Sequence, residues 1–224
     1  MKIMNRYIVI LSFLLAASQI YCQKTIDLKS DKSLTKVFNQ TEIKGLESMI
    51  QYVDNMVLIR KNKTDPNEAY HLFFEEIAQT SEYIVPFEET IKYKFLESLD
   101  SIQFSTIWRF EYHINMIRTG DTVYRNLENF QMLDIKPFGK YMNYLEETGK
   151  DDPYFQKLRE EFDNVGNLSA MTSDWFPKNH LNFDFNIPKN RLWATIYLLR
   201  REETIEMKLD RYLKNNKNVL PTMH

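Results

Sequence analysis

The sequence predicts a mainly α-helical protein, built as a single compact domain of about six helices. Two observations lead to this prediction. Apolar residues recur every three or four positions in most segments, and several segments begin at a proline, whose missing N–H costs nothing in the first turn of a helix. One stretch near residues 107–126 instead alternates apolar and polar residues, as a strand does. The mainly α prediction leaves room for one small β-hairpin there, and an α+β class is the alternative.

The first 22 residues predict a secretory signal peptide. Two basic residues precede an apolar run over 7–17, and a cut after Cys22 fits the compact residues that signal peptidase accepts. A lipid anchor at Cys22 is the alternative, which the residues before it, Ile20 and Tyr21, disfavour. The run is shorter than the ~20 residues of a membrane span. We expect a periplasmic or secreted protein without a membrane span in its mature chain.

Composition excludes several chemistries. Without residues 1–22 the chain keeps all 31 acidic but loses two of its 29 basic side chains, which gives a net charge of −4 and argues against nucleic acid as a partner. The only cysteine is Cys22, so a released chain offers no disulfide, thiol nucleophile or thiolate zinc site. The five glycines do not cluster as phosphate-binding loops require. We therefore expect no cofactor.

The helical domain is predicted to cover residues 41–214. Residues 23–40 are polar and lack a period, so we expect them to form a flexible N-terminal arm. The first helix begins near Thr41, capped by that residue or by Asn39. Its stripe, which normally packs on a core, consists of Ile43, Leu46, Met49, Ile50, Val53, Met56 and Val57.

Two prolines predict the next two helices. Asp65 and Pro66 begin the second, which runs to about Gln79. Pro86 begins the third, with glutamates in its first turn, where the helix dipole favours them. The expected buried stripe of the third helix is Ile91, Phe95, Leu99 and Ile102.

The stretch after the third helix alternates in the manner of a strand. Its apolar positions are Trp108, Phe110, Tyr112, Ile114 and Met116. A turn at Gly120 then leads into a second strand from Thr122 to about Asn126. A buried helix is the equally weighted alternative for this stretch.

Three further helices complete the prediction. Residues 137–166 form an antiparallel helical hairpin, in which Gly149 takes the left-handed conformation that ends the first helix and Gly166 ends the second. The last helix runs from Pro188 to about Lys214. Its stripe rotates after Leu199, so it either bends or meets two different neighbours. Residues 215–224 are expected to be a frayed tail.

Two groups of histidine and glutamate are candidate chemical sites. Glu68, His71 and Glu75 have a spacing that di-iron helical bundles use, but they lie opposite the apolar arc of their helix and no second such group exists, so we interpret them as a solvated surface cluster. Glu111 and His113 share one side of the predicted strand, and an exposed strand face is favoured over an acid/base pair.

The segment 167–187 holds the predicted ligand contacts. Asp174, His180 and Asp184 match no metal loop, and aromatic residues lie among them. Packing of these aromatic residues against the last helix is the favoured interpretation, and contact with a sugar or peptide is the alternative. The candidate ligand-binding residues are Trp175, Phe176, His180, Phe183 and Phe185.

Three functions are compatible with these observations. We expect an exported, non-catalytic binding protein for a protein, peptide or carbohydrate, because no catalytic motif accompanies the high aromatic content of 14%. The second hypothesis is a hydrolase or metal-dependent enzyme, whose histidine and carboxylates come together only in the fold. The third is a structural part of a cell-envelope assembly, which would need a large exposed apolar patch.

Overall fold

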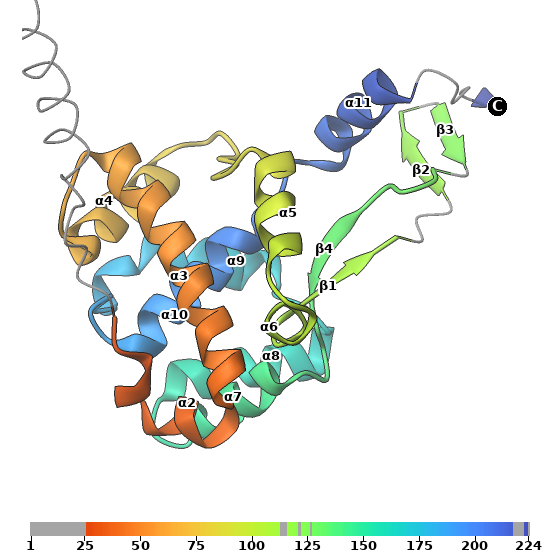
Figure 1. The fold of residues 1–224 in the computed structure, drawn as a ribbon. Helices are drawn as coiled ribbons and strands as arrows, with labels where there is room; N and C mark the ends of the chain where they lie inside the picture. The colour runs from red at the N-terminus through yellow and green to blue at the C-terminus, as the bar shows by residue number, and fades with distance from the viewer. Residues whose placement is uncertain (1–25, 113–115, 121, 126, 217–221, 224) are drawn as a thin grey trace, which may run out of the picture.

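Helices dominate the computed structural model, which describes residues 26–112, 116–120, 122–125, 127–216 and 222–223 (Figure 1). The predicted mainly α class with a small β part is confirmed, although the described residues form ten α-helices instead of about six. Helices close to the predicted ones are α3 (Gln40–Lys61), α4 (Pro66–Gln79), α5 (Glu89–Ser98), α7 (Lys140–Gly149), α8 (Pro153–Val165) and α10 (Pro188–Arg200). The helices not predicted separately are α2 (Lys32–Val37), α6 (Ser101–Ser105), α9 (Ala170–Lys178) and α11 (Ile205–Asn215), and the two 3₁₀ turns are η1 (Leu28–Ser30) and η2 (His180–Asn182).

The flexible arm predicted for residues 23–40 is wrong over its described part. Asp31 accepts a hydrogen bond from the N–H of Leu34 (3.0 Å) and so caps α2. Leu28 and Leu34 are fully buried, and the hydroxyl of Tyr144 on α7 donates to Asp31 (2.7 Å). Two widely spaced leucines give no period that a sequence could reveal.

The predicted hairpin is confirmed, and the alternative of a buried helix is wrong. Strand β2 (Met116–Thr119) pairs antiparallel with β3 (Thr122–Arg125), and the connecting Gly120 has a φ of +56°. Such a left-handed turn residue favours glycine.

The predicted first strand is in fact two strands that belong to different sheets. Its beginning, β1 (Trp108–Glu111), pairs antiparallel with β4 (Met132–Ile135), a strand that no sequence pattern indicated. At the chain end, β5 (Thr222–Met223) pairs with β3, so these two residues are not part of a frayed tail.

The main core surrounds α10, which α3 crosses in Figure 1. Residues 190–199 of α10 are all buried, including Arg191. The Arg191 guanidinium Nε donates to Asp54 Oδ1 (3.0 Å) and a second guanidinium nitrogen pairs with the other carboxylate oxygen. Tyr70 of α4 donates its hydroxyl to the same carboxylate (2.9 Å). This buried network ties α3, α4 and α10 together.

The helical hairpin of α7 and α8 depends on both of its glycines, but for different reasons. A Cβ on Gly149 would lie 2.8 Å from the Cα of Gln156, so this glycine allows α8 to approach closely. The left-handed conformation predicted for Gly149 is wrong, because its φ is not positive. Gly166 does end α8 with a φ of +72°.

The predicted last helix is interrupted after Arg200 and resumes as α11, with Thr204 as its N-cap. Leu192 and Leu199 belong to the main core, whereas Leu209 belongs to a second cluster with Ile117, Leu127 and Phe130. The expected change of neighbours is confirmed. Figure 1 shows α11 beside the β2–β3 hairpin, away from the main body. We call α11, β2, β3 and residues 127–130 the outer lobe.

The buried face of α5 is partly polar, because Glu89 and Lys92 share it with Tyr93 and Leu96. Of the predicted stripe, Phe95 and Leu99 do pack against the main core. Contrary to prediction, Ile91 and Ile102 are each 53% exposed. The face also joins a group that we call the ionic cluster: Glu89, Lys92, Tyr93, Glu202 and Lys208. The amine of Lys208 lies 2.8 Å from both Glu202 and the Tyr93 hydroxyl, and 3.0 Å from Glu89. Charged side chains normally face water, so no pattern of apolar residues indicated this contact between the body and α11.

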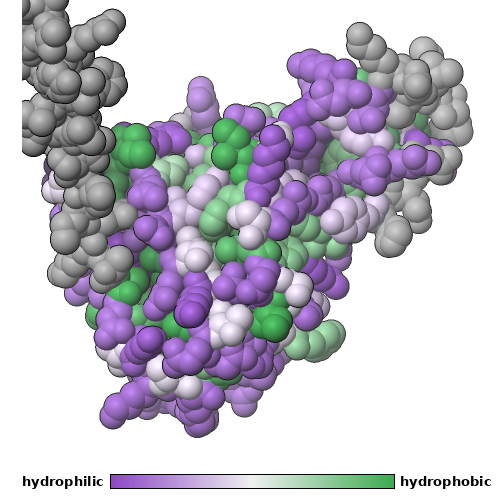
Figure 2. Space-filling view, in the orientation of Figure 1, coloured by the Kyte–Doolittle hydropathy of each residue, from purple (hydrophilic) through white to green (hydrophobic). Residues whose placement is uncertain are grey.

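None of the described helices has the length and apolarity needed to cross a membrane. Figure 2 shows the face that carries α3, where the coloured, described residues place hydrophobic side chains in small groups among hydrophilic ones. A broad apolar area, which the hypothesis of a structural assembly component requires, is not present among them on this face.

Candidate functional site

Three of the five predicted ligand contacts form part of the core. Phe176 and Phe185 are fully buried, and Phe183 is nearly so. Phe176 packs against Phe74 and Tyr197, with ring centroids 4.9 and 5.0 Å apart. These three phenylalanines are therefore not a contact surface, and the favoured interpretation of inward packing is confirmed for them.

Trp175 is the predicted contact that the structure leaves accessible. It lies on α9, whose first turn Ser169 caps, and 39% of its surface is exposed. Tyr154 of α8 stacks on the indole at 5.5 Å with an interplanar angle of 26°, and Phe183 meets it edge-on at 6.3 Å. The Tyr154 hydroxyl accepts a hydrogen bond from the indole N–H of Trp193 (2.8 Å). A half-buried tyrosine and a buried phenylalanine thus fix the orientation of an exposed indole.

A small groove lies beside this indole, between α8 and α9. Its volume is about 110 Å³, and we call it the α8–α9 groove. It is lined by Tyr154, Lys157, Leu158, Glu161, Met171, Thr172 and Trp175. Leu158 is buried, whereas Met171 is 74% exposed and offers a flexible, polarisable side chain. The groove combines an apolar lining with one residue of each charge.

Glu161 provides a fixed negative charge at the groove. Burial opposes its ionisation, but hydrogen bonds from Ser169 and Thr172 outweigh this effect and lower its pKa. The N–H of Ser169 lies 2.9 Å from the carboxylate. The carboxylate is therefore ionised at neutral pH, and it holds the start of α9 against α8.

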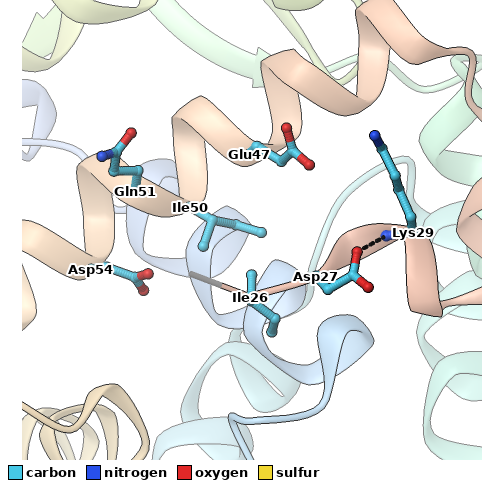
Figure 3. A pocket seen from close by; sticks show the side chains of 7 residues that line it. All are labelled: Ile26, Asp27, Lys29, Glu47, Ile50, Gln51 and Asp54. Carbon is cyan, nitrogen blue, oxygen red and sulfur yellow. Dashed lines mark hydrogen bonds between the residues drawn. The ribbon is translucent and has the colours of Figure 1, made fainter. Parts of the chain in front are cut away.

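A larger cavity of about 440 Å³ lies between α3 and the N-terminal segment (Figure 3). Its lining is mostly polar: Ile26, Asp27, Lys29, Glu47, Ile50, Gln51 and Asp54. Asp54 is engaged by Arg191 and Tyr70, and Asp27 by the N–H of Lys29 (3.0 Å). Two of the carboxylates thus already serve the fold, and none of the described residues that line the cavity is aromatic.

The fold brings together two histidines that the sequence placed in separate groups. His71 Nδ1 lies 3.0 Å from His180 Nδ1, while Glu68 instead pairs with Lys63 at 2.5 Å. Neither histidine lines the two cavities described above. Within the described ranges, no three His, Cys, Asp or Glu side chains converge as a metal site requires. His113 lies outside the described residues, and its neighbour Glu111 pairs with Arg109 (2.7 Å).

Comparison of the chain with models of protein families, with curated proteins and with solved structures gives no match. The class of protein is therefore defined by its fold, a mainly helical domain with a small β-ribbon, and by the site geometry described above.

Proposed function

We propose that this protein is exported and binds a peptide, with the α8–α9 groove holding one apolar side chain of its partner. The observation that carries this proposal is the rigidly supported, exposed indole of Trp175 beside the exposed Met171. Tryptophan and methionine are enriched at protein recognition surfaces and depleted from ordinary solvent-exposed positions. A fixed aromatic anchor also loses little conformational freedom when it binds.

The chemistry of the groove favours a peptide over a sugar. Its volume of about 110 Å³ suits a single aliphatic side chain. Sugar hydroxyls need several free polar partners, but Glu161 already accepts hydrogen bonds from Ser169 and Thr172. The exposed amine of Lys157 and the Glu161 carboxylate are placed to select charged residues that flank the apolar one.

Selection from a displayed library of random heptapeptides tests the proposal. The wild-type protein is the target, and the Trp175→Ala variant removes peptides that bind elsewhere. We expect enriched peptides to share one apolar residue and to bind Trp175→Ala at least about 30-fold more weakly, which corresponds to the ~2 kcal/mol of an aromatic hot spot.

Phe138→Ala is the matched control, because Phe138 is 98% exposed and lies outside the groove. It should bind the selected peptides as the wild type does. Enrichment of no peptide, or equal binding by wild type and Trp175→Ala, contradicts the proposal. Retention on immobilised oligosaccharides without any enriched peptide would support a carbohydrate ligand instead.

Export is the second part of the proposal, and the pattern of residues 1–22 supports it. N-terminal sequencing of protein recovered from the periplasm or the medium should begin at Gln23. Cytoplasmic protein that retains residue 1 contradicts export, and a lipid-modified Cys22 contradicts release.

A further inference from the structure

His71 on α4 and His180 on η2 form a hydrogen bond, and the number of additional protons that the two rings can bind without breaking this bond is limited. The two Nδ1 atoms are 3.0 Å apart and the ring centroids 5.3 Å. One ring radius at each end accounts for the difference, so the two nitrogens lie close to the line between the centroids. One Nδ1–H must donate along this line to the lone pair of the other ring.

The first additional proton leaves this bond intact, because it binds Nε2 of the donor ring. A second proton has to occupy the accepting Nδ1, which would place two N–H groups and two positive charges against one another. The closed contact therefore holds at most one additional proton, whereas two separated histidines with ordinary pKa values hold nearly two at pH 5.

We propose that this histidine pair is a pH-sensitive latch, which opens the contact between η2 and α4 in acid and thereby loosens the α8–α9 groove. The coupling runs through aromatic contacts that follow His180 in the chain. Phe185 packs on His71 with centroids 5.0 Å apart, and Phe183 packs edge-on against Tyr154 at 4.8 Å. Tyr154 in turn supports the Trp175 indole.

The surroundings of the pair agree with opening in acid. Burial lowers the pKa of both histidines, and the charge of His180 lowers that of His71 further. Asp65 and Asp184 act on His71 and Glu75 acts on His180, and each favours protonation. These carboxylates stabilise the first proton but do not relieve the clash that the second proton creates.

Cations on the elements that pack beside the pair have partners of their own. Lys178 at the end of α9 pairs with Asp174 at 2.6 Å. Arg191 on α10 pairs with Asp54. Near this contact, the histidines are therefore the groups that change charge between pH 7 and 5.

Hydrogen exchange on the full-length mature chain without ligand tests the latch. Protection factors, which correct for the intrinsic pH dependence of exchange, are compared for residues 180–185 at pH 6 and pH 5. Opening takes up about one proton, so these factors should fall about tenfold per pH unit. Helix α3 serves as the internal reference and should change far less.

His71→Asn is the decisive variant, because its side-chain oxygen accepts from His180 Nδ1–H whether or not His180 is charged. It should keep residues 180–185 protected at both pH values, while Phe138→Ala, at a position that is 98% exposed, should behave as wild type. Equal protection of the wild type at pH 6 and pH 5, or an undiminished pH dependence in His71→Asn, overturns the latch.

The effect on the groove rests on the proposed function, and it is measured separately. The dissociation constant of a heptapeptide selected at pH 7 should rise at pH 5 in wild type but not in His71→Asn. If residues 180–185 open while affinity is unchanged, the coupling is overturned. If they open and no peptide binds at any pH, the proposed function fails while the latch stands.

Discussion

Replacing Arg191 by methionine tests the energetics of the core most sharply. The side chains of Arg191 and Asp54 are only 1% and 5% exposed, and the guanidinium supplies two of the three hydrogen bonds that the carboxylate accepts. The substitution leaves a buried carboxylate with the Tyr70 hydroxyl alone. Breaking a buried pair in this way costs about 3–5 kcal/mol, out of the roughly 5–15 kcal/mol by which domains are usually stable.

Urea unfolding followed by circular dichroism measures this loss. With a slope of about 2 kcal/mol per molar urea, the midpoint should fall by about 1.5–2.5 M. The double variant Asp54→Leu with Arg191→Met removes both charges and should recover most of the loss, because no uncompensated charge remains. Lys150→Met, which removes an exposed ion pair with Glu147, should leave the midpoint unchanged.

The pH dependence provides a second check on the same variant. Burial raises the pKa of Asp54 even with Arg191 present. A carboxyl whose folded-state pKa is raised binds more protons in the folded than in the unfolded state, so its penalty shrinks as pH falls. The midpoint difference between wild type and Arg191→Met should therefore be smaller at pH 5 than at pH 7. A loss below 1 kcal/mol, or a double variant as unstable as the sum of the two single ones, refutes this reasoning.

Three further predictions follow from packing and charge. Gly149→Ala should lower stability by about 1–3 kcal/mol in urea unfolding, because its Cβ would overlap the backbone of α8, and an unchanged midpoint would contradict that close approach. Lys208→Met removes the cation that Glu89 and Glu202 share, which leaves Glu89 with Arg211 and Glu202 with Lys92. Amide exchange should therefore accelerate across α11 but not α3, and equal acceleration in both would mean that the outer lobe is not a separate unit. Because the pKa of Glu161 is lowered in the folded state, its ionised carboxylate stabilises the fold. This contribution is complete above the unfolded-state pKa of 4.5 and is lost as pH falls through the lower, folded-state pKa. Glu161→Gln should therefore reduce stability at pH 6 far more than at pH 3.

Periodicity predicted those parts of the fold that bury apolar residues along one regular stripe. The helix α3 shows this, since its predicted stripe residues Ile43, Leu46 and Val53 are all buried. Periodicity did not predict the buried face of α5, because charged residues lie on that face. Their charges are neutralised by residues far away in the sequence, which a local pattern of apolar positions does not indicate. Glu89 and Lys208 are more than a hundred positions apart, yet their charged groups lie 3.0 Å from each other.

The candidate site was predictable in part. An aromatic-rich segment near a helix start indicated Trp175, but alternation and spacing could not tell which aromatic rings face solvent. The α8 half of the groove was missed, because Tyr154 was not distinguished from the core residues that flank it. The contact between His71 and His180 depends on how η2 folds back on α4, which is a property of the tertiary structure alone.

The indole N–H resonance of Trp175 provides the most direct test of the proposed binding site. The protein labelled with ¹⁵N is titrated with N-acetyl-leucinamide, a probe that carries one apolar side chain between two peptide groups, and separately with methyl glucoside. We expect the amide to shift the Trp175 signal while the signal of Trp108, which is fully buried elsewhere, stays in place. A Trp175 signal that does not move with the amide, or that moves only with the glucoside, would contradict the proposed site.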